Sequence, residues 1–210
     1  MLFRSSLVSG LSMFQVILLT LMGANNGARE IAKERDVLDK ELRAGLSPWA
    51  YVTTKSLLVF GLSLAQAFWM TWFVKTVCGF PGSFPQQFLI LFVTTLAMSM
   101  TCVAISAASK SPERASLLAI YLVGLQLPLS GAVLALPEIV STLCRPFIAA
   151  YWGWSGYLKT LSASPLYDIV RQSTDTTVAD FNQCLLVLSL HAIVCGLIAW
   201  IFVARNFSKR

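Results

Sequence analysis

Long apolar runs separated by short polar clusters dominate the hydropathy pattern of this chain. Five of these runs are nearly free of charged residues, and they cover about residues 5–27, 50–75, 87–109, 115–136 and 183–204. A helix that crosses a lipid bilayer needs about 20 consecutive apolar residues, so each run is long enough to cross once. The pattern therefore predicts an all-α integral membrane protein, with five transmembrane helices in a single domain over residues 1–210.

One stretch, residues 28–45, breaks this pattern because it is dense in charge. It holds five basic and five acidic residues. Three opposite-charge pairs lie four residues apart, a spacing that stabilises helices: Arg35 with Asp39, Asp36 with Lys40, and Asp39 with Arg43. Ile31, Leu38 and Leu42 share one side at helical spacing, with Val37 beside them. The stretch is predicted to form one amphipathic helix that connects the first two spans.

Turn-forming residues mark where several of these helices begin and end. Gly45 fits the position after a helix C-terminus, while Ser47 and Pro48 fit the N-cap and first position of the next helix. Ser111 and Pro112 repeat this start signal between the third and fourth spans. The connecting helix is therefore expected to end sharply before the second span.

Residues 137–182 match neither a span nor an ordinary soluble loop. The segment 146–157 carries five aromatic residues and is too short to cross the bilayer, so it is predicted to lie at the surface or to re-enter the membrane. A second short amphipathic stretch is predicted from Ser164, with Leu166, Ile169 and Val170 on its apolar side. The whole insert precedes the last span.

Composition and charge exclude a soluble protein and set the topology. Hydrophobic residues make up 56% of the chain and charged residues 12%, with a net charge of +6. Eleven of the sixteen basic residues fall on one predicted side, which the positive-inside rule places in the cytoplasm. This puts the N-terminus outside and the C-terminus in the cytoplasm, in a bacterial inner membrane or a plasma membrane. The sequence has no basic face with interleaved aromatic residues outside the spans, so it does not indicate nucleic-acid binding.

A few residues leave other interpretations open. Arg4 and the apolar run after it also fit a signal peptide, but cleavage would move the charged helix outside, against the charge distribution. Cys78, Cys144 and Cys184 fall near one predicted face, where a disulfide among them is an alternative to free thiols. His191 lies inside the fifth span without an acidic partner in any span, which favours a hydrogen bond between helices over catalysis.

Motifs for covalent or nucleotide chemistry are absent from the sequence. There is no Walker-type phosphate loop, no Gly-x-Ser-x-Gly turn, and no metalloprotease or other clustered metal-ligand pattern. We therefore expect a non-catalytic protein with no metal site and no cofactor in this chain.

The charged stretch and its surroundings resemble the membrane domain of type-2 ABC exporters of the G-subfamily kind. The residues that carry the resemblance are Arg29, Glu30, Ile31, Lys33, Glu34, Arg35, Glu41, Ala44-Gly45-Leu46-Ser47-Pro48, Tyr51 and Lys55, followed by Ser111-Pro112-Glu113-Arg114 and Ser130-Gly131. The aromatic segment before the last span is also similar to that family's re-entrant extracellular insert. The resemblance covers nearly the whole chain.

The resemblance implies a permease subunit of an ATP-driven exporter that moves a hydrophobic or amphipathic substrate by alternating access. Its partners would be an ABC ATPase domain that binds ATP and Mg²⁺, a second copy of this chain or a homologous permease, and membrane lipid. The residues implied in coupling to the ATPase are Glu30, Lys33, Glu34, Arg35, Glu41, Glu113 and Arg114. Those implied in the substrate cavity and its gate are Phe14, Met22, Pro128, Ala132 and Val133.

Two features depart from the family pattern. The family has six spans, and this chain begins at the one that corresponds to the second. In addition, Ala132 and Val133 stand where the family commonly has a leucine pair that closes the cavity. An alternative function is therefore a truncated or repurposed membrane anchor or assembly protein of the same fold that does not transport.

Overall fold

The computed structural model describes residues 2–131, 138–164, 167–168, 171 and 176–208, and the regular elements in these ranges are all helices. In chain order they are α1 (Leu2–Gly27), η1 (Ala32–Glu34), α2 (Arg35–Arg43), α3 (Pro48–Cys78), α4 (Phe84–Ala108), α5 (Pro112–Leu129), α6 (Glu138–Cys144), η2 (Arg145–Phe147), α7 (Ala149–Lys159) and α9 (Phe181–Ser208).

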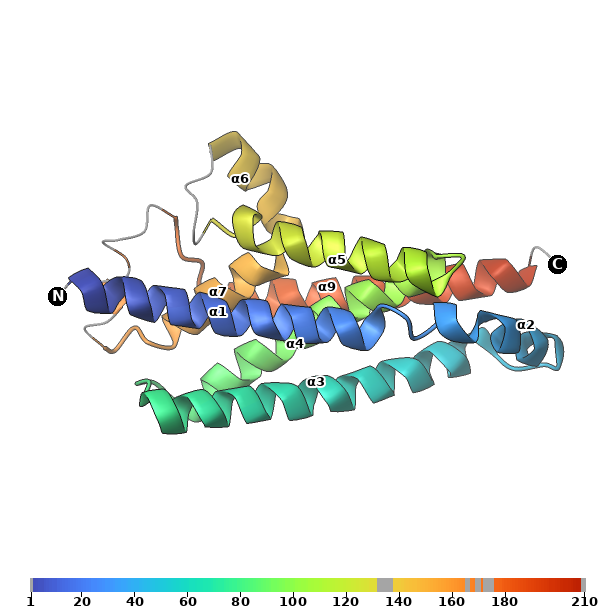
Figure 1. Ribbon diagram of the computed structural model, residues 1–210, viewed down its shortest axis with the longest axis horizontal. Coiled ribbons are helices and arrows are strands. Elements are labelled where there is room, and N and C mark those ends of the chain that lie inside the picture. The colour runs from blue at the N-terminus through green and yellow to red at the C-terminus, as the bar shows by residue number, and fades with distance from the viewer. Residues whose placement is uncertain (1, 132–137, 165–166, 169–170, 172–175, 209–210) are drawn as a thin grey trace.

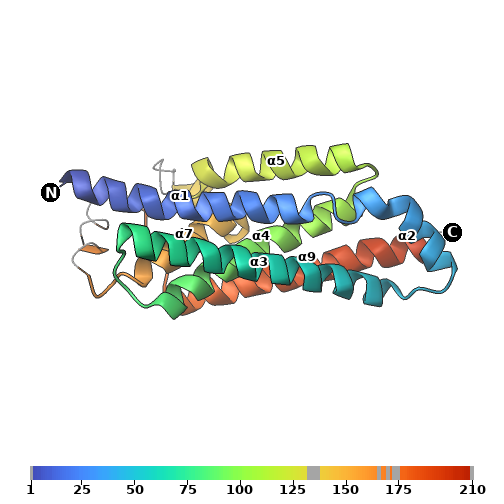
Figure 2. The ribbon, with the colours of Figure 1, turned by 60° about the horizontal axis from the view of Figure 1, so that its bottom comes forward.

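Helix α4 lies at the centre of an elongated bundle, and α1, α3, α5, α7 and α9 all pack against it (Figures 1 and 2). In the most apolar 18-residue window of α4, 72% of the residues are buried, against 28% in the corresponding windows of α3 and α9. The chain surrounds its most buried long helix with helices that expose long apolar faces. That arrangement is typical of a protein whose outer surface contacts lipid.

Three of the five predicted spans are confirmed as helices long and apolar enough to cross a membrane, namely α3, α4 and α9. The other two coincide with α1 and α5, which are helical but fall outside that group within the described residues. Five membrane crossings therefore remain a prediction.

Glycines allow α1 and α7 to approach α4 closely. A Cβ atom on Gly27 would lie 2.3 Å from the carbonyl oxygen of Ser99, and one on Gly153 would lie 2.6 Å from Thr94 Oγ1. Small residues at such crossings bring helix backbones together inside membranes. Here Gly27 and Gly153 let α1 and α7 pack directly on α4. Trp154 and Tyr157 of α7 are buried in the core beside it.

The predicted helix ends are largely confirmed. Gly45 has a φ of 103° after the last turn of α2, in the left-handed region that favours glycine. Ser47 is the N-cap residue of α3 with Pro48 next to it. Ser111 is the N-cap of α5, where its Oγ accepts a hydrogen bond from the Arg114 N–H at 3.4 Å.

The connecting helix over residues 28–45 is a wrong prediction in its first half. Residues 28–31 form a turn, η1 follows, and only Arg35–Arg43 is α-helical. The helix breaks because the N–H groups of Ile31 and Ala32 donate to Ser106 Oγ of α4 instead of to carbonyls within the segment. Leu38 and Leu42 are buried as predicted, as is Ile31.

Val37 does not belong to this apolar stripe, because it is 56% exposed. It lies about 100° around the α2 axis from Leu38, which turns it away from the bundle.

The fourth span is shorter than predicted, and one of the two predicted alternatives for the aromatic segment is wrong. α5 ends at Leu129, not 136, and Gly131 then adopts a φ of 72°, so Pro128 lies in the last turn of α5. The aromatic segment forms η2 and α7; Phe147 of η2 is 70% exposed, whereas Tyr151, Trp154 and Tyr157 of α7 are buried in the bundle. This burial contradicts a segment that lies flat on a surface, and the re-entrant alternative stays a prediction. The amphipathic stretch predicted from Ser164 falls mostly outside the described residues, as do Leu166, Ile169 and Val170.

All five cysteines are free, so the alternative of a disulfide among Cys78, Cys144 and Cys184 is not found. His191 lies half-buried in α9.

Candidate functional site

The charged stretch lies at one end of the bundle, together with the loop between α4 and α5 and the C-terminal end of α9 (Figures 1 and 2). These are the three regions that the charge count assigns to one side of the membrane. The N-terminus of the chain lies at the opposite end (Figure 1). The candidate site is therefore a surface formed by η1, α2, the loop between α4 and α5, and the C-terminal end of α9.

Lys55 holds the stretch to α3. Its Nζ lies 3.2 Å from Glu30 Oε2 and 2.7 Å from Glu34 Oε2, and so bridges both carboxylates. The Lys55 side chain is 14% exposed, whereas that of Glu34 is 45% exposed. An ammonium group shielded from water between two carboxylates forms stronger ion pairs than one on an open surface.

Tyr51 extends this contact by one helical turn. Its hydroxyl donates to Glu34 Oε2 at 3.3 Å, and its ring lies 5.8 Å from Lys55 Nζ in a cation–π arrangement. Because Tyr51 and Lys55 are four residues apart in α3, they occupy the same face of that helix. Glu34 therefore accepts from two groups on a single rigid element.

A second set of contacts holds the stretch to α4 and α5. Besides the two backbone N–H groups that Ser106 accepts, at 3.1 and 2.9 Å, an Arg35 Nη1 donates to the backbone carbonyl of Ser109. Arg29 Nε donates to Ser116 Oγ of α5 at 2.6 Å. The segment between α1 and α2 thus has polar ties to three of the long helices. We refer to these contacts, together with those of Lys55 and Tyr51, as the joint.

The remaining residues implied in coupling point outward. Lys33, Glu41, Glu113 and Arg114 are all exposed. At Glu113, the residue's own backbone N–H and the Ser111 hydroxyl stabilise the carboxylate, and its pKa lies below its usual range. The predicted coupling set therefore divides into an anchored group, Glu30, Glu34 and Arg35, and an exposed group that a partner can reach.

Three of the five residues implied in a substrate cavity are described, and they lie on α1 and α5. Phe14 of α1 is exposed, Met22 is half-buried against the core, and Pro128 is half-buried at the end of α5. Ala132 and Val133 lie outside the described residues.

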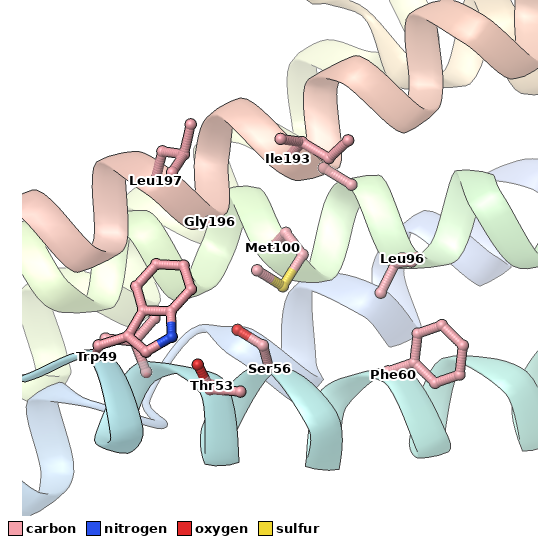
Figure 3. A pocket seen from close by; sticks show the side chains of 11 residues that line it. Trp49, Thr53, Ser56, Phe60, Leu96, Met100, Ile193, Gly196 and Leu197 are labelled. Atoms are coloured by element: carbon pink, nitrogen blue, oxygen red, sulfur yellow. The ribbon is translucent and has the colours of Figure 1, made fainter.

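An open hollow lies elsewhere, between α3, α4 and α9 (Figure 3). Its volume is roughly 330 Å³. Its lining comes from these three helices and includes no residue of α1 or α5.

Sequence reasoning missed several residues of the joint. Lys55 is among the residues that carry the resemblance but has no predicted ion-pair partner, and Ser106, Ser109 and Ser116 have no predicted role. The available signal was the recurrence of serines near the ends of two predicted spans on the side of the charged stretch, where hydroxyl groups that become buried need hydrogen-bond partners.

Comparison with known families adds one independent observation. A family model described as ABC-2 type transporter matches residues 2–159. No curated protein matches the chain. The matched region includes α1 to α7, and with them every contact of the joint described above.

Proposed function

The chain belongs to the ABC-2 type transporter family and is the transmembrane permease component of an ABC transporter; from this premise we propose that it exports a hydrophobic or amphipathic molecule by alternating access. The work would come from ABC ATPase domains on another chain, which bind ATP and Mg²⁺. This chain would contribute no catalytic group and would change the relative stability of its inward-open and outward-open states.

The anchored joint is the observation that supports coupling. A partner that binds the exposed residues of η1, α2 and the loop before α5 would move a segment tied to three long helices. Lys55 would pass that movement to α3, and Ser106 and Ser109 would pass it to α4. Because the ties are ion pairs and hydrogen bonds of fixed geometry, the segment would move with these helices and not independently of them.

The face formed by α1 and α5 supports a dimer. Of the eighteen residues of α5, three are buried, namely Ala115, Ala119 and Gln126. The neighbouring α1 exposes Phe14 and Leu21. We propose that a second copy of this chain covers this face and that the substrate passes between the two copies, with α1 and α5 lining the path.

The orientation follows the same proposal. The charged joint would face the cytoplasm, where the ATPase binds, and the N-terminus would lie outside, in a bacterial inner membrane or a plasma membrane. Lipid would surround the remaining helices.

Co-purification from native membranes tests the docking surface. Tagged wild-type chain is expected to recover an ABC ATPase, and the charge reversal Lys33→Glu/Glu41→Lys to lower that recovery at least five-fold. The matched control, Asp168→Lys/Arg171→Glu, reverses one exposed charge of each sign in the insert and should leave recovery unchanged. Equal recovery by all three chains would remove the proposed surface.

A further double variant separates docking from coupling. Glu30→Gln/Glu34→Gln keeps the exposed residues but removes the ties to Lys55, so the ATPase should still bind while transport into inverted vesicles falls. If transport is lost only when the ATPase is lost, the joint does not couple. A chain that binds the ATPase but never moves an amphipathic dye would instead be the membrane anchor.

A further inference from the structure

The hollow between α3, α4 and α9 is an apolar groove along one side of the bundle (Figure 3). Its walls are residues of α3 (Trp49, Val52, Thr53, Ser56, Phe60), of α4 (Leu96, Met100) and of α9 (Ala192, Ile193, Gly196, Leu197). At roughly 330 Å³ it lies near the lower limit for small-molecule pockets. We refer to it as the lateral groove.

The lining of the lateral groove selects an apolar occupant. It contains no charged side chain, and its polar side-chain atoms are the two hydroxyls of Thr53 and Ser56 and the indole nitrogen of Trp49. Such a surface offers little to a phosphate group, a metal ion or a charged substrate, because burying an unpaired charge there is costly. Methylene groups, in contrast, gain from contact with it.

The length and position of the groove match one leaflet of a bilayer. It begins at Trp49, in the first turn of α3, and Trp49 also packs edge-to-face on Trp200 of α9 with ring centroids 5.8 Å apart. Tryptophans are enriched at the membrane–water interface. From Trp49 to Phe60 the helix advances by roughly 16 Å, about half of a hydrocarbon core of about 30 Å.

The groove opens to the bilayer and is kept open by a glycine. Trp49 and Ile193 are 57% and 61% exposed, so its mouth faces outward among other exposed apolar side chains of α3 and α9. A Cβ on Gly196 would lie 3.0 Å from Met100 Cε, which leaves little room for a side chain there without filling the groove. Lipid can therefore enter sideways.

We propose that the lateral groove binds one acyl chain of a phospholipid from the leaflet on the side of the charged segment. The site lies on α3, α4 and α9, away from the α1–α5 face assigned to transport. It therefore stands on the membrane location of these helices and does not depend on the proposed export function. A bound chain would fill the space between α3 and α9 beside the joint.

Photo-cross-linking in vesicles tests the proposal. The full chain is reconstituted in phosphatidylcholine doped with an analogue that carries a photoactivatable diazirine in its acyl chain, and the adducts are mapped by peptide mass spectrometry. We expect adducts concentrated in residues 49–60 and 192–197. Adducts spread evenly over all exposed apolar positions would overturn the proposal.

Two matched pairs of variants sharpen the result. Gly196→Phe fills the groove and should lower labelling of these segments at least five-fold, whereas Gly61→Phe, at a glycine with open space around it, should leave labelling within two-fold. Ile193→Trp narrows the mouth of the groove from an exposed position, so we expect it to preserve the fold even if Gly196→Phe does not. Its matched control is Val194→Trp, at the next position along α9, which does not line the groove. Unchanged labelling in Ile193→Trp would contradict the proposal.

Discussion

Replacing Gly27 by alanine should destabilise the bundle, although the added group is a single methyl. Gly27 is the last residue of α1, where that helix crosses α4. Its new Cβ would lie 2.3 Å from the Ser99 carbonyl oxygen, 2.8 Å from the Val103 nitrogen and 3.0 Å from Cys102 Cβ. Two of these atoms belong to the backbone of α4, so no side-chain rotation can relieve the overlap.

The size of the effect follows from this geometry. Ordinary contact begins near 3.4 Å, so α1 would have to move by about 1 Å, which forfeits roughly a quarter to a half of the dispersion energy at the contact. Overpacking of this kind costs about 1–3 kcal/mol. Alanine returns up to about 1 kcal/mol through its higher helix propensity. When the full propensity gain is subtracted, the net loss is up to about 2 kcal/mol, or a fall in Tm of up to roughly 8 °C for a chain of this size.

Thermal denaturation of the detergent-solubilised chain, followed by size-exclusion chromatography, measures the change. The control is Gly61→Ala, since a methyl group added at Gly61 would have nothing within 4 Å of it. That variant gains helix propensity without a clash, so its Tm should stay level or rise. If Gly27→Ala is as stable as Gly61→Ala, the close crossing of α1 and α4 is refuted.

Three further predictions concern polar contacts. Lys55→Met should cost about 1–2 kcal/mol of stability, which is less than the loss of a fully buried ion pair because Glu34 is partly exposed. The triple variant Lys55→Met/Glu30→Gln/Glu34→Gln should recover most of that loss in the same Tm assay. If it does not, the ion pairs are incidental to stability. The amides of Asn26 and Gln66 exchange hydrogen bonds of 2.8 and 3.0 Å between α1 and α3, so a double-mutant cycle with leucine at each position should give a coupling energy of about 0.6–1.7 kcal/mol, and additivity would contradict it. Gln126 Oε1 accepts the Ala150 N–H at 2.9 Å and so caps α7 from α5; Gln126→Leu should speed amide hydrogen exchange in the first turn of α7, while the exposed neighbour Leu127→Ala should not.

Local chemistry made the helix ends predictable. Gly45, Ser47 and Pro48 act through the backbone within a few residues, so their roles can be read from the chain alone. The burial of Leu38 and Leu42 follows in the same way from helical spacing. Each of these features depends on residues that are close together in the sequence.

The joint was harder to predict because its partners are distant in sequence. The side-chain ties of Glu30 and Glu34 run to Lys55 in another helix, and the N–H groups of Ile31 and Ala32 find Ser106 more than seventy residues away. Spacing within the stretch favours local ion pairs and a continuous helix, and only packing against α4 reveals a competing acceptor. The aromatic segment is similar, since its burial depends on Gly153 meeting Thr94.

The broken helix gives the joint a direction that a continuous helix would lack. An unbroken helix from α1 into α2 would carry a push along its own axis, directly into α1. The turn at 28–31 interrupts that rigid path. Its residues are instead bonded to helices beside it: Arg29 to α5, Glu30 to α3 and Ile31 to α4. A force on α2 would therefore reach the bundle mainly through Lys55, Ser106 and Ser109. Because α1, α3, α5 and α9 all contact α4, a displacement delivered there would spread to these four helices together.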